Sequence, residues 1–172
     1  LPGDGFCLDS GGKCSLRAAI EEANAAANSC GTIDINFDST CFASVNGPYE
    51  IFWSTPLDPI QHNVNINGPG ADILTINGGD NRIFTINSGF TVSISGLTLT
   101  EGLAPGDDPQ GGALKNNGGT VTVNDCVFTG NSAEGDGGAI YNTGGSLTLN
   151  NCTIDDNDTN GFGGGIANYS GT

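Results

Sequence analysis

Apolar and polar residues alternate along most of the chain, and in the last third the alternation recurs at a fixed step. In 120–124 and again in 146–150 every second residue is apolar, which is the period of a strand with one buried face. Segments 111–136 and 137–162 are identical at 11 of 26 aligned positions. A repeat of this length is typical of solenoids, and its Gly-Gly pairs exclude long helices. The pattern therefore predicts an all-β chain folded as a parallel β-helix, with one coil per repeat.

Equivalent positions of successive coils should stack about 4.8 Å apart along the axis of such a fold. The expected inward stacks are Leu114 with Ile140 and Ile166, Val121 with Leu147, Val123 with Leu149, and Phe128 with Ile154. Asn116, Asn142 and Asn168 recur at the same step. Because stacked side-chain amides hydrogen-bond one another, these three residues predict an asparagine ladder at a corner of the coil.

The N-terminal part has a different pattern. Ser15 is a good N-cap, and residues 16–23 place apolar side chains at the spacing of one helix face. We expect a helix over 15–27 that covers the open edge of the first coil. The predicted organisation is an N-terminal cap over 1–31 and a β-helix over 32–172, with its clearest repeats from 111.

Charge and composition exclude several classes of function. The net charge is −15 and the chain has only four Lys and Arg residues, so no basic patch for nucleic acid can form. No apolar run is long enough for membrane insertion. We also expect no cofactor. Residues 104–110 contain two Pro and two Asp and predict a loop that protrudes from the solenoid.

The six cysteines favour an oxidising, extracellular setting. Six cysteines allow 15 pairings. Short spacing and the repeat favour Cys7–Cys14, Cys30–Cys41 and Cys126–Cys152. The last pair is one repeat apart, which predicts Cα atoms about 5 Å apart, within the range that a disulfide spans. Free buried thiols are the alternative, and a metal site is disfavoured because the chain has one His and no C-x-x-C motif.

Two sets of motifs resemble known families. Gly5-Phe-Cys7 and Gly12-Lys-Cys14-Ser-Leu-Arg-Ala-Ala-Ile20-Glu-Glu-Ala-Asn24 resemble the CSLREA domain of exported bacterial surface proteins, with Ala18 where that family has Glu. Gly137-Gly-Ala-Ile140 and Phe128-Thr-Gly-Asn131 resemble the GGAI and FxxN motifs of chlamydial polymorphic outer-membrane proteins. The resemblance implies a right-handed parallel β-helix at an extracellular or cell-surface location. It carries over no catalytic residues.

Acidic residues gather near the expected corners of the later coils. Asp125, Asp155, Asp156 and Asp158 are candidates for the carboxylate pair of a polysaccharide hydrolase, although solvated acidic turns have the same composition. No Arg or Lys adjoins them as in a lyase. His62 is the only histidine and is expected at the surface, outside any catalytic triad. We therefore expect that the protein is not an enzyme.

Two further motifs are partial matches. The segment that contains Asp156, Asp158 and Asn160 matches the first half of a calcium loop, but Ala167 stands where the bidentate Glu belongs, so we expect no metal site. Three glycosylation sequons begin at Asn151, Asn157 and Asn168. They are acceptors only in a eukaryotic secretory pathway, and an Asn-rich repeat explains them equally well.

The hydroxyl residues of 91–93, 120–122 and 146–148 should stack on one outward face. Such ladders bind glycans or ice, although outward Thr is also simply a good strand residue. The third repeat is still in register at Thr172, which suggests head-to-tail self-association. Together these features predict an extracellular structural β-helix, a subunit of a filament or matrix. The alternatives are an adhesin or glycan-binding module and a polysaccharide lyase or hydrolase.

Overall fold

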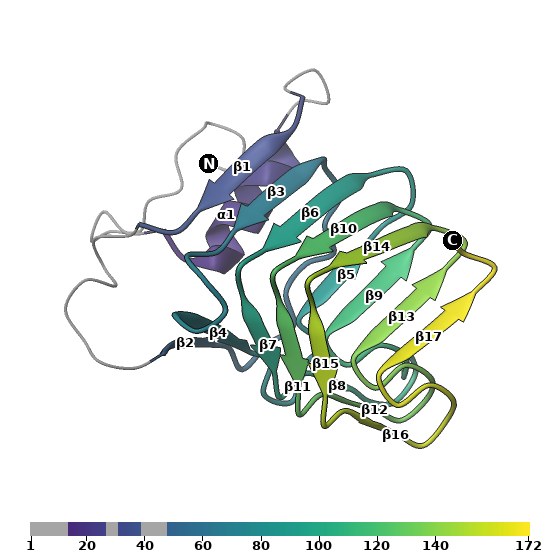
Figure 1. Cartoon of the computed structure of the whole chain (residues 1–172). Helices are drawn as coiled ribbons and strands as arrows, with labels where there is room; N and C mark the ends of the chain where they lie inside the picture. Colours follow the sequence, from purple (N-terminus) through teal and green to yellow (C-terminus); the bar gives the residue numbers. More distant parts are fainter. Residues whose placement is uncertain (1–13, 27–30, 39–47) are drawn as a thin grey trace.

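The computed structural model describes residues 14–26, 31–38 and 48–172, which form one helix and four narrow parallel sheets (Figure 1). The helix is α1 (Leu16–Ala25). Sheet A contains β1 (Ile33–Asn36), β3 (Val64–Asn67), β6 (Thr91–Ser95), β10 (Thr120–Asn124) and β14 (Ser146–Asn150). Sheet B contains β2 (Tyr49–Phe52), β4 (Leu74–Asn77), β7 (Thr98–Thr100), β11 (Val127–Thr129) and β15 (Thr153–Asp155). Sheet C contains β5 (Phe84–Ile86), β9 (Leu114–Asn117), β13 (Ile140–Thr143) and β17 (Ile166–Tyr169), and sheet D contains β8 (Leu103–Ala104), β12 (Ser132–Ala133) and β16 (Asp158–Thr159).

The chain passes through sheets A, B, D and C in each complete coil, and every strand pairs in parallel with the strand one coil away. Figure 1 shows the coils stacked from β1 to β17 as successive turns of one solenoid. The fold is therefore the parallel β-helix that the repeat predicted.

The inward stacks follow the predicted register. Leu114 pairs with Ile140, which pairs with Ile166, and the other predicted pairs, Val121 with Leu147, Val123 with Leu149 and Phe128 with Ile154, are also confirmed. Leu114, Ile140, Val121, Val123 and Phe128 are completely buried. Alternate residues of each strand point into this core because the side-chain period of a strand is two.

Helix α1 begins after Ser15, whose hydroxyl accepts a hydrogen bond from the Ala18 amide at 3.1 Å, as the N-cap predicted. Its buried residues Leu16, Ile20 and Ala23 join the same apolar core as the first coils. The helix ends at Ala25 rather than at 27, because the next residue is already extended. Ten residues are too few to cross a membrane, and no helix in the described part of the chain is a candidate span.

The helix is tied to the connection that follows β2. The Arg17 guanidinium donates hydrogen bonds to the carbonyl oxygens of Thr55 (2.6 Å) and Pro56 (2.8 Å). The Asn24 amide donates to the Pro59 carbonyl and accepts from the Gln61 amide. These contacts fix α1 at the N-terminal end of the core. The predicted boundary between a cap over 1–31 and a β-helix over 32–172 stays a prediction.

The expectation of a surface position for His62 is wrong. The side chain is only 3% exposed, and its Nδ1 lies 3.2 Å from the Asn63 carbonyl oxygen. The neighbouring Ile60 bridges to Ile86 of sheet C and is also buried. The residues before β3 therefore belong to the first coil rather than to a solvated loop, and this places His62 inside.

The predicted disulfide between Cys126 and Cys152 is also wrong, because both cysteines are free. Each precedes a strand of sheet B, one coil apart, and their side chains point the same way. Cys126 Sγ lies 3.2 Å from the Asn124 carbonyl oxygen, and Cys152 Sγ lies 3.4 Å from the equivalent oxygen of Asn150. Parallel side chains on adjacent coils keep the sulfur atoms about 4.8 Å apart, too far for an S–S bond of about 2.05 Å.

Cys14 is disulfide-bonded. Cys7, Cys30 and Cys41 lie outside the described residues, so the pairings Cys7–Cys14 and Cys30–Cys41 stay predictions.

Candidate functional site

Two internal motifs recur in every late coil, and the first is a buried asparagine at the corner between sheets B and D. Asn131 is 1% exposed. Its Nδ2 donates to the carbonyl oxygens of Leu99 (3.0 Å) and Thr129 (3.3 Å) and to Asn157 Oδ1 (2.9 Å). Its Oδ1 accepts from the Gly102 amide at 2.9 Å. One side chain thus satisfies the polar groups of three consecutive coils where the backbone turns.

The second motif is the Gly-Gly pair before β9, β13 and β17, the last three strands of sheet C. Gly137 has φ of 71°, a left-handed angle that glycine adopts without strain. A Cβ on Gly138 would lie 2.1 Å from the Gly164 carbonyl oxygen and 2.3 Å from that of Asp158. Only a glycine therefore lets adjacent coils approach at this corner.

The asparagine ladder predicted for sheet C is confirmed. Asn116 Nδ2 donates to Asn142 Oδ1 at 2.7 Å, and Asn142 Nδ2 donates to Asn168 Oδ1 at 2.8 Å. Asn116 and Asn142 are completely buried. This ladder and the Asn131–Asn157 pair stabilise the solenoid, and neither presents a reactive group to solvent.

The outer face of sheet A is polar and almost free of charge. Register pairing stacks Thr91, Thr120 and Ser146 in one row, and Ser93, Thr122 and Thr148 in the next, so the predicted hydroxyl rows are confirmed. Of the outward residues of its five strands, only Asp34 is an acidic or basic residue. The charge of −15 therefore resides elsewhere.

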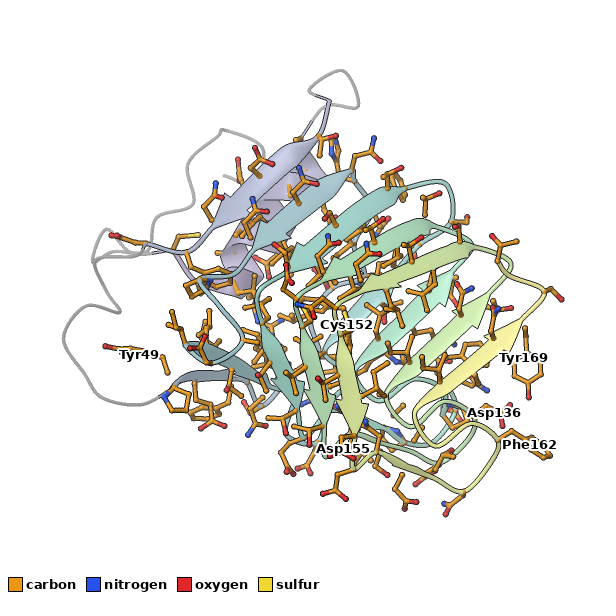
Figure 2. All side chains as sticks on the ribbon, in the orientation of Figure 1. Tyr49, Asp136, Cys152, Asp155, Phe162 and Tyr169 are labelled. Atoms are coloured by element: carbon orange, nitrogen blue, oxygen red, sulfur yellow. The ribbon has the colours of Figure 1, made fainter. Side chains whose placement is uncertain are left out.

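An exposed group of aromatic residues lies on the outside of sheet C and on the connection that leads to it. Tyr169 is 40% exposed and Phe162 is 76% exposed, and the Tyr141 and Tyr169 ring centroids are 5.6 Å apart with an interplanar angle of 36°. Asp136 lies among them, because its Oδ1 accepts the Phe162 amide hydrogen at 2.7 Å. Figure 2 shows Tyr169, Asp136 and Phe162 side by side at the edge of the molecule next to β17. We call Tyr141, Phe162, Tyr169 and Asp136 the aromatic patch.

Asp136 acts on the other polar group of the aromatic patch, the Tyr169 hydroxyl. Partial desolvation and the neighbouring Asp136 raise the pKa of Tyr169 above its ordinary value. Near neutral pH the patch therefore presents a neutral phenol and exposed aromatic rings beside Asp136.

Two of the four cations of the chain lie beside the patch and hold the loop over 105–110. Arg82 donates to the carbonyl oxygens of Gln110 (3.1 Å) and Gly111 (2.9 Å) and to Asp108 Oδ2 (2.9 Å). Lys115 contacts the other carboxylate oxygen of Asp108. The predicted protruding loop is thus fastened to sheet C, and we call Arg82, Asp108 and Lys115 the loop anchor.

The loop anchor and the aromatic patch are adjacent. The Lys115 Nζ lies 5.8 Å from the centroid of the Tyr141 ring, within the range of a cation–π contact. Burial raises the pKa of Asp108, but the hydrogen bond from Lys115 and the charges of Arg82 and Lys115 outweigh this effect, so the pKa lies below its ordinary value. Lys115 is therefore paired with Asp108, and its ammonium group also lies near the Tyr141 ring.

A hollow of about 240 Å³ adjoins the loop anchor, because Arg82 and Asp108 are among the residues that line it. Prolines, aspartates and Arg82 contribute to its lining, and none of the residues that line it is aromatic. Binding sites for organic ligands are commonly rich in aromatic side chains. The aromatic patch is therefore the better candidate for a functional site.

The acidic residues considered as catalytic carboxylates lie at two corners, with Asp155, Asp156 and Asp158 around the corner between β15 and β16 and Asp125 at another. Asp125 precedes β11 at one end of sheet B, where its carboxylate accepts from Asn151 Nδ2 at 2.6 Å. Asp156 follows β15 at the other end and has a left-handed backbone. The strand between these corners separates them by roughly 10 Å or more, beyond the usual span of a hydrolase carboxylate pair.

The partial calcium motif is spread over a corner and a strand. Asp156 lies at the corner, whereas Asp158 belongs to β16. Within the described residues no three His, Cys, Asp or Glu side chains are grouped so that they could hold a metal ion.

The side-chain amides of the three sequon asparagines differ in the hydrogen bonds that they make. Asn151 is exposed at a corner and donates to Asp125. Asn157 donates to the carbonyl oxygens of Phe128 (3.0 Å) and Asp155 (2.8 Å), and Asn168 belongs to the sheet C ladder. A glycan on Asn157 or Asn168 would remove an amide hydrogen that the solenoid uses, so Asn151 is the most accessible of the three.

Reasoning from the sequence alone missed the aromatic patch. Tyr169 occupies the row of Thr143 and Asn117, and Phe162 stands one repeat after Asp136. The inward residues recur at equivalent positions of each repeat. The aromatic patch consists of outward positions at which the residue differs from one repeat to the next. Large aromatic residues at outward positions of a polar solenoid were the available signal.

One comparison with known families gives a match, to the Chlamydia polymorphic membrane protein repeat over residues 125–143. The matched segment contains Asn131, Gly137 and Gly138, which are the corner residues whose role is described above. No curated protein and no solved structure matches the chain significantly. The chain is thus a parallel β-helix in which one repeat is similar to that of the Chlamydia polymorphic membrane proteins.

Proposed function

We propose that the protein is a cell-surface β-helix that adheres to neutral glycans through the aromatic patch. The observation that carries the proposal is the exposed grouping of Tyr141, Phe162 and Tyr169 around the Asp136 carboxylate. Large exposed apolar groups that cluster on a soluble protein mark interaction sites, and aromatic residues dominate the affinity of such sites. A sugar ring offers C–H groups to an aromatic face and hydroxyl hydrogens to a carboxylate.

Charge favours neutral rather than acidic glycans. The chain carries a net charge of −15, and in the patch Asp136 is an acid while the nearby Lys115 is already paired with Asp108. A uronic or sialic acid would meet uncompensated negative potential. Neutral hexoses and N-acetylhexosamines meet no such barrier.

The location at the cell surface rests on the similarity of residues 125–143 to a repeat of Chlamydia polymorphic membrane proteins. The resemblance of the N-terminal segment to CSLREA domains points the same way and suggests export from a bacterium. A structural role in a matrix is compatible with adhesion, because a rigid solenoid can carry a binding face. Head-to-tail self-association stays a prediction.

The proposal can be tested with the full chain on an array of neutral and acidic glycans. We expect binding to at least one class of neutral glycan, a loss of about tenfold or more in Tyr169→Ala, and little binding to uronates. Tenfold corresponds to about 1.4 kcal/mol, a typical effect for a central aromatic residue of an interface. Binding confined to acidic glycans, or unchanged in Tyr169→Ala, would contradict the proposal.

A further inference from the structure

The free cysteines Cys126 and Cys152 form a two-thiol column that the glycan proposal does not use. Cys126 is 1% exposed and Cys152 is half-buried. They occupy equivalent positions of consecutive coils, directly before β11 and β15, which pair in register. Figure 2 marks Cys152 at the start of β15.

The two sulfur atoms have equivalent surroundings. Cys126 Sγ lies 4.0 Å from the Ile94 carbonyl oxygen, and Cys152 Sγ lies 3.5 Å from that of Val123, which is the register partner of Ile94. Each sulfur also lies close to the carbonyl two residues before it. Matching contacts mean matching rotamers, so one coil translation of about 4.8 Å relates the two sulfur atoms.

We propose that Cys126 and Cys152 form a binding site for one soft, two-coordinate monovalent cation of the Cu⁺ and Ag⁺ class. A metal–thiolate bond is about 2.3 Å long, so a cation midway between two sulfur atoms in a straight line requires a separation of about 4.6 Å. The coil spacing of about 4.8 Å supplies this distance with little movement. Soft thiolate ligands select monovalent copper over hard cations.

The surroundings select against other metals. A structural zinc ion requires four ligands in a tetrahedron, and in the described part of the chain no third His, Cys, Asp or Glu joins the two thiols. Leu97, in the equivalent position one coil earlier, is completely buried and offers no donor. The pair therefore suits a cation that is satisfied with two ligands.

Binding proceeds without oxidation or reduction. Two S–H bonds break, two sulfur–metal bonds form, and two protons pass to solvent, which leaves a complex of charge −1. Burial raises the pKa of the Cys126 thiol to about 11, with further contributions from the neighbouring Cys152 and Asp125. The Cys126 thiol is consequently protonated at neutral pH, and only a cation with high affinity for sulfur displaces its proton.

The probe is Ag⁺ added to the full chain in a chloride-free buffer, observed by native mass spectrometry and by silver X-ray absorption. We expect one tightly bound Ag⁺ with two sulfur neighbours, and an affinity at least about 100-fold lower in Cys152→Ser, because even outer-shell changes lower metal affinity by about 10–100-fold. The matched control is the double variant Cys30→Ser/Cys41→Ser, which should keep this ion.

Cys152 is the variant of choice because its half-buried side chain tolerates serine better than the buried Cys126. A wild-type far-UV circular dichroism spectrum shows that the variant is folded. Equal Ag⁺ affinity in wild type and folded Cys152→Ser, loss of the ion in the Cys30→Ser/Cys41→Ser control alone, or three or more sulfur neighbours around the silver would each overturn the proposal.

Discussion

The corner asparagine Asn131 should be among the most sensitive positions of the solenoid. Replacing it by alanine removes the two N–H donors of Nδ2, which lie within reach of the Leu99, Thr129 and Asn157 oxygens, and the bond that Oδ1 accepts from the Gly102 amide. The site is 1% exposed, so water cannot easily replace the amide. The carbonyl of Leu99 and the amide of Gly102 are left without this partner in the interior.

The expected loss follows from two donated bonds and one accepted bond. Each contributes about 1 kcal/mol net, and buried groups left unpaired add to the loss, so Asn131→Ala should lower the free energy of unfolding by about 3–5 kcal/mol. This is a large fraction of the roughly 5–15 kcal/mol that stabilises a typical domain. With a urea dependence of about 2 kcal/mol per molar, the unfolding midpoint should fall by roughly 2 M.

The assay is equilibrium urea unfolding of the full chain, followed by far-UV circular dichroism. Asn150→Ala is the matched control, because Asn150 is exposed on sheet A and its amide donates only to Asn124 Oδ1, at 2.8 Å. We expect a loss below about 1 kcal/mol for this variant. If Asn131→Ala unfolds within 0.5 M of Asn150→Ala, a threshold of roughly 1 kcal/mol at the slope used above, the claim that corner amides hold the coils together is wrong.

Four further predictions follow from single sites. Gly138→Ala should be destabilised by about 3 kcal/mol or more in the same urea assay, because its Cβ would meet two carbonyl oxygens. The lowered pKa of Asp108 stabilises the anchored loop above the unfolded pKa of about 3.9. The protection of the 105–110 amides, taken relative to the intrinsic exchange rate at each pH, should therefore fall as the pH falls through the lower folded value, whereas in Asp108→Asn the protection should already be low. The raised pKa of Tyr169 favours the neutral phenol, and this stabilisation is lost as the pH rises through the folded pKa. An ultraviolet titration should show one tyrosine that ionises late in wild type and closer to about 10 in Asp136→Asn. We expect no cleavage of pectin or alginate, and cleavage that disappears in Asp156→Ala would contradict this.

The interior of the fold was predictable because each coil is the previous coil shifted by one strand spacing along the axis. An inward residue must fit the residue one coil earlier, so Leu114, Ile140 and Ile166 repeat in kind and in step. The buried amides of Asn116 and Asn142 repeat because each needs the next for a hydrogen bond. Helix α1 was predictable from its N-cap Ser15 and from the spacing of the apolar residues that follow it.

Other features depend on the direction of a side chain or of the chain itself, and the spacing of residues in the sequence does not specify either. Cys126 and Cys152 have the separation of a disulfide between their backbones, but their side chains run parallel. His62 is buried because the segment before β3 belongs to the first coil, as the bridge of Ile60 to Ile86 shows.

The aromatic patch escaped sequence analysis for a different reason. Outward residues face solvent and need not match their neighbours, so Tyr169 follows Thr143 without any constraint from the core. The residues that serve function in a solenoid are therefore expected at positions where the repeat is broken on the outside. Such positions can be recognised only when the strand register of every coil is known.

The most direct test of glycan adhesion compares two phenylalanines of equal exposure. Phe162 in the aromatic patch and Phe52 on the outer face of sheet B are both 76% exposed. Affinity for the best neutral glycan of the array should be measured by calorimetry for Phe162→Ala and Phe52→Ala in the full chain. We expect a loss of about tenfold or more for Phe162→Ala and none for Phe52→Ala. Equal affinities of the two variants would contradict it.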